Sequence, residues 1–260
     1  MSLQRRLFNL AFVVTGAVVL TGSIAQASLI GYYTFEGSAA DVSGNGKNGT
    51  FGPTAPTLTP NGFSGSAYQF GADASTYITV PININPGALP QVTFGAWVNA
   101  ATANNVIRGI ISHDTGNFDR TLDMDTRGPA AGPEWCAFAG PVSLAICNGA
   151  VSANEWVFLA VRYDANTGAI ALTRNGSHTL SNGFPENNGT TVTYIGRNPG
   201  FDSPFDGRID NVFFYDEFLS DAQVESIYRN GVSNVPEPSS FVLMAAALGC
   251  GLVSRVRRRG

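Results

Sequence analysis

The stretch FDGRIDNVFFYDEFLSDAQVESIYRNG, residues 205–231, carries the signals for a buried strand followed by a short helix. Alternate residues of a strand point to opposite faces of its sheet. Within Arg208–Tyr215 apolar side chains fall on both faces, with Ile209, Phe213 and Tyr215 on one and Val212 and Phe214 on the other. Two apolar faces are typical of a strand inside a two-sheet sandwich.

The helix is expected to begin at Ser220 and to end at Gly231. Ser220 and Gln223 have the spacing of a capping box, in which each side chain accepts a hydrogen bond from the other residue's backbone N–H. Gly231 supplies a C-terminal stop. Asp210 interrupts the apolar strand, and a carboxylate there needs a partner.

The composition indicates one domain rich in turns, because the 260 residues include 30 glycines and 14 prolines. The formal net charge is −4, from 15 basic and 19 acidic residues. Six of the arginines lie at the two ends, and without them the chain keeps nine basic residues against 19 acidic ones, so the body has a charge near −10. A domain with this negative charge is not suited to bind nucleic acid or an anionic membrane.

Residues 1–27 are expected to form a secretory signal peptide. Arg5 and Arg6 precede the apolar run Leu7–Leu20, and Ala25-Gln26-Ala27 is an Ala-x-Ala cleavage site. Ala25 and Ala27 would then precede a mature protein that starts at Ser28. An uncleaved anchor is the alternative.

The C-terminal segment, 232–260, joins three features in order. Val235, Pro236, Glu237, Pro238 and Ser239 come first, an apolar run over about 239–254 follows, and the basic tail 255–260 ends the chain. The run has the length of a short membrane span, and the positive-inside rule would keep the tail cytoplasmic.

This C-terminal pattern resembles the PEP-CTERM sorting signal. The resemblance implies Sec-type export in a Gram-negative bacterium and transient anchoring in the inner membrane. An exosortase would then cleave the chain and release it to the cell surface or the extracellular matrix. A permanent tail anchor is the alternative.

The body between the two ends reads as a series of strands. They are expected at Ser28–Phe35, Tyr68–Phe70, Tyr77–Val80, Val92–Val98, Val106–Ser112, Arg120–Asp125, Glu155–Tyr163, Ala169–Arg174 and Thr191–Gly196. In Val92–Val98 the apolar residues alternate cleanly with Thr93, Gly95 and Trp97.

Four segments of the body resemble laminin-G-like domains of the concanavalin A-like type. They are the Gly207–Val212 strand with its following helix, the Asp41–Thr50 loop, the Thr93–Val98 strand, and the Trp156–Asp164 strand with its Asn175-Gly176 turn. The resemblance spans about Ser28–Gly231. It implies an all-β jelly-roll of two antiparallel sheets with one short C-terminal helix. The two terminal segments described above would add hydrophobic targeting helices at both termini.

In many such relatives the Asp41 loop and the Asp of the closing strand hold a structural Ca²⁺ ion. The resemblance therefore implies a calcium site with Asp41, Asn45, Thr50 and Asp210 as ligands. The alternative is an Asx-turn without a metal.

Cys136 and Cys147 are expected to form a disulfide that closes a hairpin, because the chain carries an export signal. Two free thiols are the alternative. Cys250 lies in the C-terminal tail.

Asp123 and Asp125 share one face of a predicted strand. A solvated strand face is favoured over a glycosidase acid pair, because the Glu residues of a concanavalin A-like glucanase motif are missing. Trp135, Tyr68, Tyr77 and Phe118 are candidates for an aromatic sugar platform, although most aromatic residues belong to sandwich cores.

These patterns favour a non-catalytic, exported surface or matrix protein whose domain binds extracellular polysaccharide or a surface protein. A concanavalin A-like glycoside hydrolase or polysaccharide lyase, and a purely structural matrix component, are the alternatives. The fold alone does not decide among them.

Overall fold

The computed structural model describes residues 27–116, 118–138, 140 and 145–232. The predicted signal peptide, except for its last residue Ala27, and the predicted C-terminal segment, except for its first residue Val232, lie outside this range. Within the described range, no helix is long and apolar enough to span a membrane.

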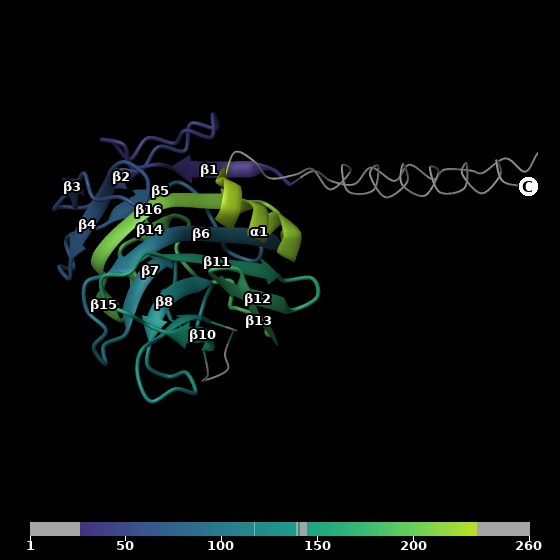
Figure 1. Cartoon of the computed structure of the whole chain (residues 1–260). Helices are drawn as coiled ribbons and strands as arrows, with labels where there is room; N and C mark the ends of the chain where they lie inside the picture. The colour runs from purple at the N-terminus through teal and green to yellow at the C-terminus, as the bar shows by residue number, and fades with distance from the viewer. Residues whose placement is uncertain (1–26, 117, 139, 141–144, 233–260) are drawn as a thin grey trace, which may run out of the picture.

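The described residues form sixteen strands and one helix (Figure 1). The first eight strands are β1 (Leu29–Tyr33), β2 (Thr50–Phe51), β3 (Thr57–Thr59), β4 (Ala67–Gly71), β5 (Ile78–Val80), β6 (Gln91–Ala100), β7 (Arg108–Ser112) and β8 (Thr121–Asp125). The remaining elements are β9 (Glu134–Ala137), β10 (Ile146–Ala150), β11 (Val157–Asp164), β12 (Ala169–Arg174), β13 (Ser177–Asn182), β14 (Thr193–Ile195), β15 (Ser203–Pro204), β16 (Asp206–Tyr215) and α1 (Asp221–Asn230).

The strands make two eight-stranded sheets, which confirms the predicted all-β sandwich. Sheet A has the order β13-β12-β11-β6-β16-β4-β3, with β1 beside the second half of β16. Sheet B has the order β10-β9-β8-β7-β14-β5-β2, with β15 beside β7. Apart from the β15–β7 pair, all named strand pairs are antiparallel.

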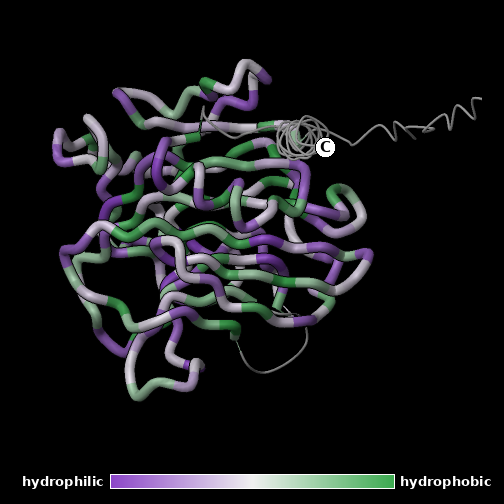
Figure 2. The backbone as a smooth tube through the Cα atoms, turned by 45° about the vertical axis from the view of Figure 1, so that its right-hand side comes forward, coloured by the Kyte–Doolittle hydropathy of each residue, from purple (hydrophilic) through white to green (hydrophobic). Residues whose placement is uncertain are grey.

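The main core lies between the two sheets. From β6 it receives Val92, Phe94, Ala96 and Val98, as their alternation predicts. Green and purple segments alternate along many strands in Figure 2, which is the pattern of strands with one face toward a core. A second, smaller apolar cluster lies on the outer face of sheet A, where α1 packs on Phe158 of β11 and Phe213 of β16.

Helix α1 has the predicted caps. The Ser220 hydroxyl accepts a hydrogen bond from the backbone N–H of Gln223, and the Gln223 side chain accepts one from the Ser220 backbone N–H. At the other end the N–H of Gly231 donates to the carbonyl of Ile227. These caps fix both ends of a helix of only ten residues.

The prediction of which side chains share one face of β16 is wrong for Ile209. Ile209 does not share a face with Phe213 and Tyr215, because it lies in the main core with Val212 and Phe214. The register of β16 against β6 shifts between Asp210 and Phe213, and Asn211 has a φ of 51°. A bulge residue adds one position to the strand and thereby reverses the side-chain alternation.

Candidate functional site

Strand β8 places two carboxyl groups on the outer side of sheet B. Leu122 and Met124 point into the core, so Asp123 and Asp125 point the other way. Both aspartates are nevertheless 0% exposed, because the chain turns after β8 and Arg127 lies against them. The prediction of a solvated strand face is therefore wrong.

Asp123 is a buried carboxyl group with one satisfied oxygen. Its Oδ1 accepts a hydrogen bond from the Thr121 hydroxyl at 3.2 Å, whereas its Oδ2 has no partner among the described residues. Burial, reinforced by the charges of Asp125 and Asp202, raises the pKa of Asp123 well above its usual value. This environment favours the protonated, neutral form.

Asp125 is held by Arg127. The Arg127 Nε lies 3.0 Å from each carboxylate oxygen, and Nη2 also contacts Oδ2. The same guanidinium group stacks over the ring of Phe138, 4.8 Å from its centroid, and lies 5.6 Å from the centroid of Phe118. Arg127 thus joins a buried carboxylate to an aromatic surface.

An open pocket of about 220 Å³ lies over this group. We call it the aspartate pocket; its lining is Asp114, Gly116, Phe118, Arg127, Phe138, Phe201 and Asp202. Phe201 is 57% exposed at its edge. The pocket therefore combines aromatic surface with carboxylate acceptors.

The two carboxylates of the pocket are fixed by one amide. The Asn198 Nδ2 lies 3.3 Å from Asp114 Oδ2 and 3.0 Å from Asp202 Oδ2. Asp114 Oδ1 also accepts the backbone N–H of Gly116 at 2.7 Å. Nearby, burial and the charge of Asp114 raise the pKa of Asp119 to about 7. This crowding of acidic groups makes the pocket suited to hydrogen-bond donors and unsuited to anions.

The aromatic residues singled out in the sequence lie in different places. Trp135 and Tyr68 are buried in the core, and Tyr77 packs against Tyr194 instead. Of the four candidates, Phe118 is the one that lines the aspartate pocket.

Most residues of the aspartate pocket are not indicated by any pattern in the sequence. Asp114, Arg127, Phe138, Phe201 and Asp202 stand in or beside turns, without a shared spacing. Phe118 is the lining residue that the sequence singled out, and the DxD pattern of β8 supplies Asp125, which pairs with the lining residue Arg127.

The predicted calcium residue Asp41 stabilises its own loop. Its Oδ1 accepts the backbone N–H groups of Tyr32 and Ser43, at 3.0 and 2.9 Å, and its Oδ2 accepts that of Lys47 at 2.9 Å. Partial burial opposes ionisation, but the hydrogen bonds outweigh it and lower the pKa of Asp41. N–H groups therefore point at oxygens that a cation would need.

The other three predicted ligands have separate partners. The Asn45 amide donates to the carbonyl of Leu29, and the Thr50 carbonyl accepts from the Thr79 hydroxyl. Asp210 Oδ2 accepts the backbone N–H of Ser64 at 3.1 Å.

Asp210 differs from Asp41 in its environment. It is 0% exposed, its Oδ1 has no partner in the described part of the chain, and burial raises its pKa to about 6. Within the described residues, no hydrogen bond joins two of the four predicted ligands, and no three His, Cys, Asp or Glu side chains are grouped to hold a metal. The calcium site at these four residues therefore stays a prediction from the family resemblance.

Cys136 and Cys147 form the predicted disulfide, with a Cα–Cα distance of 4.1 Å. They face each other across the β9–β10 pair, so the bridge closes a hairpin at the edge of sheet B.

The comparison with solved structures finds the same fold. One match is domain 4 of AbnA, a GH43 extracellular arabinanase from Geobacillus stearothermophilus, in complex with arabinotriose. It has a TM-score of 0.61 and 19% identity, and the match covers 79% of this chain and 100% of that one.

Receptor-binding domains of botulinum neurotoxins also match. The type G domain has a TM-score of 0.58 and 15% identity, over 78% of this chain and 51% of that chain. The neurotoxin DC domain in complex with rat synaptotagmin II has a TM-score of 0.58 and 13% identity, over 79% and 52%. The chain thus spans about half the length of these toxin domains.

No curated protein sequence matches the chain significantly. The Laminin_G_3 family model, described as the concanavalin A-like lectin/glucanases superfamily, matches residues 70–225. This match covers more than half of the chain and includes most strands of both sheets. The chain belongs to the concanavalin A-like lectin/glucanases superfamily.

Proposed function

We propose that this protein is an exported, non-catalytic, lectin-like protein that binds an extracellular polysaccharide in the aspartate pocket. The observation that carries the proposal is the joint presence of Phe201, Phe118 and Phe138 with the carboxylates of Asp114 and Asp202 in one open pocket. A sugar has apolar C–H faces that pack on aromatic rings and hydroxyl groups that donate to carboxylates. An acidic pocket favours such a neutral donor over an anionic ligand.

The geometry of β8 supports a binding role over hydrolysis. A glycosidase needs two carboxyl groups that reach the bond from opposite sides. Asp123 and Asp125 share a face but are closed to solvent, and Asp125 is held by Arg127. Asp114 and Asp202 are both held by Asn198.

Oligosaccharide binding tests the proposal, with arabinotriose as the first probe because it is bound in one of the structural matches. A wider glycan array and a panel of surface proteins should follow, and reducing-sugar release should be measured throughout. We expect glycan binding without hydrolysis. Phe201→Ala should weaken binding on the order of tenfold, whereas Leu180→Ala, at an exposed site outside the pocket, should leave it unchanged. Hydrolysis, or binding of a protein alone, would overturn the proposal.

We also infer export and sorting, from the predicted signal peptide and the predicted C-terminal sorting segment. Ser28 N lies 2.8 Å from Asp216 Oδ1, so signal cleavage after Ala27 would place the new amino group beside a carboxylate. Exosortase processing at Val235–Ser239 would then release the domain from the inner membrane. Intact-mass spectrometry of protein from the native host tests both steps. A mature protein that keeps the tail through Gly260 contradicts the sorting step.

A structural Ca²⁺ ion at Asp41, Asn45, Thr50 and Asp210 stays a prediction from the family resemblance. If the ion binds the native state, calcium should raise Tm relative to a chelator, and Asp41→Asn or Asp210→Asn should remove that difference. The hydrogen bonds of Asp41 predict the same Tm with and without calcium. Scanning calorimetry decides between the two.

A further inference from the structure

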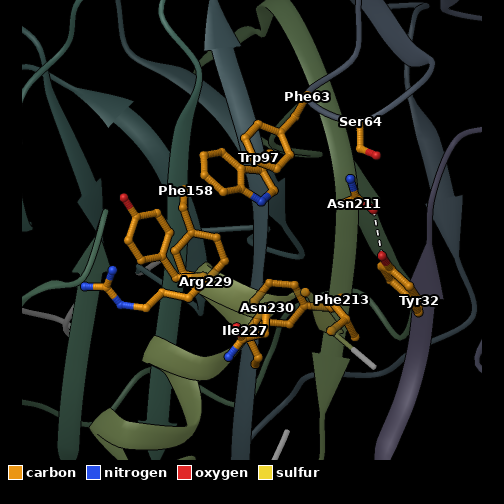
Figure 3. A pocket seen from close by; sticks show the side chains of 13 residues that line it. Tyr32, Phe63, Ser64, Trp97, Phe158, Asn211, Phe213, Ile227, Arg229 and Asn230 are labelled. Carbon is orange, nitrogen blue, oxygen red and sulfur yellow. Dashed lines mark hydrogen bonds between the residues drawn. The ribbon is translucent and has the colours of Figure 1, made fainter. Parts of the chain in front are cut away.

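A second pocket lies on the outer side of sheet A, where α1 covers part of the sheet (Figure 3). Its volume is about 290 Å³, just below the range of about 300–1,000 Å³ for ligand sites. Strands β1, β6, β11 and β16, the end of α1 and the loop between β3 and β4 all contribute to its lining. We call it the aromatic pocket.

Stacked rings form one wall of the aromatic pocket. Phe63 lies parallel to Trp97, with the ring centroids 3.4 Å apart and an angle of 8° between the planes. The Trp97 ring also contacts two further aromatic rings, with centroid distances of 5.6 Å to Phe158 and 5.7 Å to Tyr228. Phe63 is 44% exposed, so this stack reaches the surface.

Polar groups face the stack across the pocket. The Tyr32 hydroxyl donates to Asn211 Oδ1 at 2.7 Å, and Ser64 lies above them in Figure 3. Arg229 also lines the pocket, but it is paired with Glu225. The polar side of the pocket therefore offers hydroxyl and amide groups rather than an unpaired charge.

The loop that carries Phe63 is anchored on both sides. Ser64 N–H donates to Asp210 Oδ2 at 3.1 Å, and Ser66 N–H donates to both carboxylate oxygens of Glu36 at 3.1 and 3.0 Å. The Asn61 carbonyl accepts from Arg208 at 3.0 Å. A ring that is held in place before binding lowers the entropic cost of binding a ligand.

We infer that the aromatic pocket is a second carbohydrate site, which takes one residue of a neutral polysaccharide chain. The apolar face of a sugar ring would pack on the Phe63–Trp97 wall, and its hydroxyl groups would reach Tyr32 and Asn211. A neutral sugar fits because the cation that lines the pocket, Arg229, is already paired and the buried carboxyl of Asp210 lies under the Phe63 loop.

This inference goes beyond the proposed function, which needs only the aspartate pocket. Sheets A and B carry the two sites on opposite outer faces of the sandwich, so one domain would contact two polysaccharide chains at once. The protein would then cross-link the matrix.

The experiment is calorimetric titration of the full chain with neutral trisaccharides of glucan, xylan and mannan, with trigalacturonate as the anionic comparison. We expect two sites per chain for a neutral trisaccharide and weaker binding of trigalacturonate. Phe63→Ala should weaken one site on the order of tenfold, Phe63→Trp should retain it, and Tyr32→Phe should weaken it a few-fold.

Phe63→Ala and Phe201→Ala serve as controls for each other, since each removes an exposed ring from one pocket. Loss of binding with Phe63→Ala alone supports the inference and shows that the proposed function is misplaced; loss with Phe201→Ala alone overturns the inference and leaves the proposed function intact. A lowered Tm in Phe63→Ala together with weaker binding at both sites indicates a folding effect and also overturns it. So does occupancy of the pocket by the segment after Val232, seen as sugar binding that appears only when that segment is removed.

Discussion

The two outer faces of the sandwich each carry an arginine–aspartate pair, but the burial is reversed. On sheet B the carboxylate of Asp125 is 0% exposed, while its partner Arg127 is 30% exposed. On sheet A the guanidinium of Arg162 is 2% exposed, while Asp221 at the start of α1 is 62% exposed. When a pair is broken, the cost is set by whether the charge left behind is buried. Removing the partner of the buried carboxylate on sheet B and removing the partner of the buried guanidinium on sheet A should therefore lower the free energy of unfolding by different amounts.

The faces also differ in what covers them. Sheet A is covered by α1 and a second apolar cluster, so its pocket is mainly aromatic. Sheet B is covered by loops that bring aspartates and one arginine together. One fold thus presents an aromatic site and an acidic site, each with an exposed phenylalanine at its edge.

The largest expected effect comes from Arg127→Ala, because it leaves the buried Asp125 carboxylate with the backbone N–H of residue 127 but without its guanidinium partner. Loss of one member of a buried pair costs roughly 3–5 kcal/mol. We expect the free energy of unfolding in urea to fall by that amount. A loss below 1 kcal/mol would show that water or another donor replaces Arg127.

Reduction of the Cys136–Cys147 disulfide should cost about 3 kcal/mol, because the short loop gains freedom in the unfolded chain. The effect should be local to one face. Hydrogen exchange should speed up in β9 and β10, at the edge of sheet B, before it does in β11 and β6, in the middle of sheet A. Equal acceleration in both sheets would contradict this difference. The oxidised protein is the control.

A smaller and pH-dependent effect is expected at Asp210, whose folded-state pKa is about 6 against 3.8 in an ordinary carboxyl. Between these values the folded chain holds a proton that the unfolded chain has lost, so stability falls as pH rises. Asp210→Asn cannot ionise and should be more stable than the wild type by about 1–2 kcal/mol at pH 7.

The wild type and Asp210→Asn should have the same free energy of unfolding near pH 4, because Asp210 is protonated there in the folded state. Urea titrations at pH 4, 5, 6 and 7, in the presence of a chelator, measure the difference in the free energy of unfolding. Asp41→Asn is the matched control, because the pKa of Asp41 is lowered and its variant should lose stability at pH 7. A constant difference between Asp210→Asn and the wild type across this range would show that Asp210 does not titrate there.

The smallest effect is expected for Asp221→Ala, the counterpart of Arg127→Ala on the other face. Arg162 keeps its hydrogen bond to the Leu219 carbonyl at 2.8 Å, and Asp221 is largely solvated. The loss should be about 1 kcal/mol, from the ion pair and the helix start. A loss as large as that of Arg127→Ala would remove the proposed difference between the faces.

The sequence alone determined the parts of this protein that depend on local periodicity. The alternation of Val92, Phe94, Ala96 and Val98 shows which face of β6 meets the core, because strand side chains alternate. The caps of α1 follow from Ser220, Gln223 and Gly231, because their hydrogen bonds stay within the helix ends.

Only the tertiary structure decided the bulge and the pockets. The left-handed Asn211 moved Ile209 to the other face of β16, and strand periodicity carries no sign of an added residue. Of the aspartate pocket the sequence indicated only Phe118, because its other residues come from loops far apart in the chain. Asp123 and Asp125 look solvated as an alternating pair, yet they are buried, because burial depends on what later segments cover and not on the strand itself.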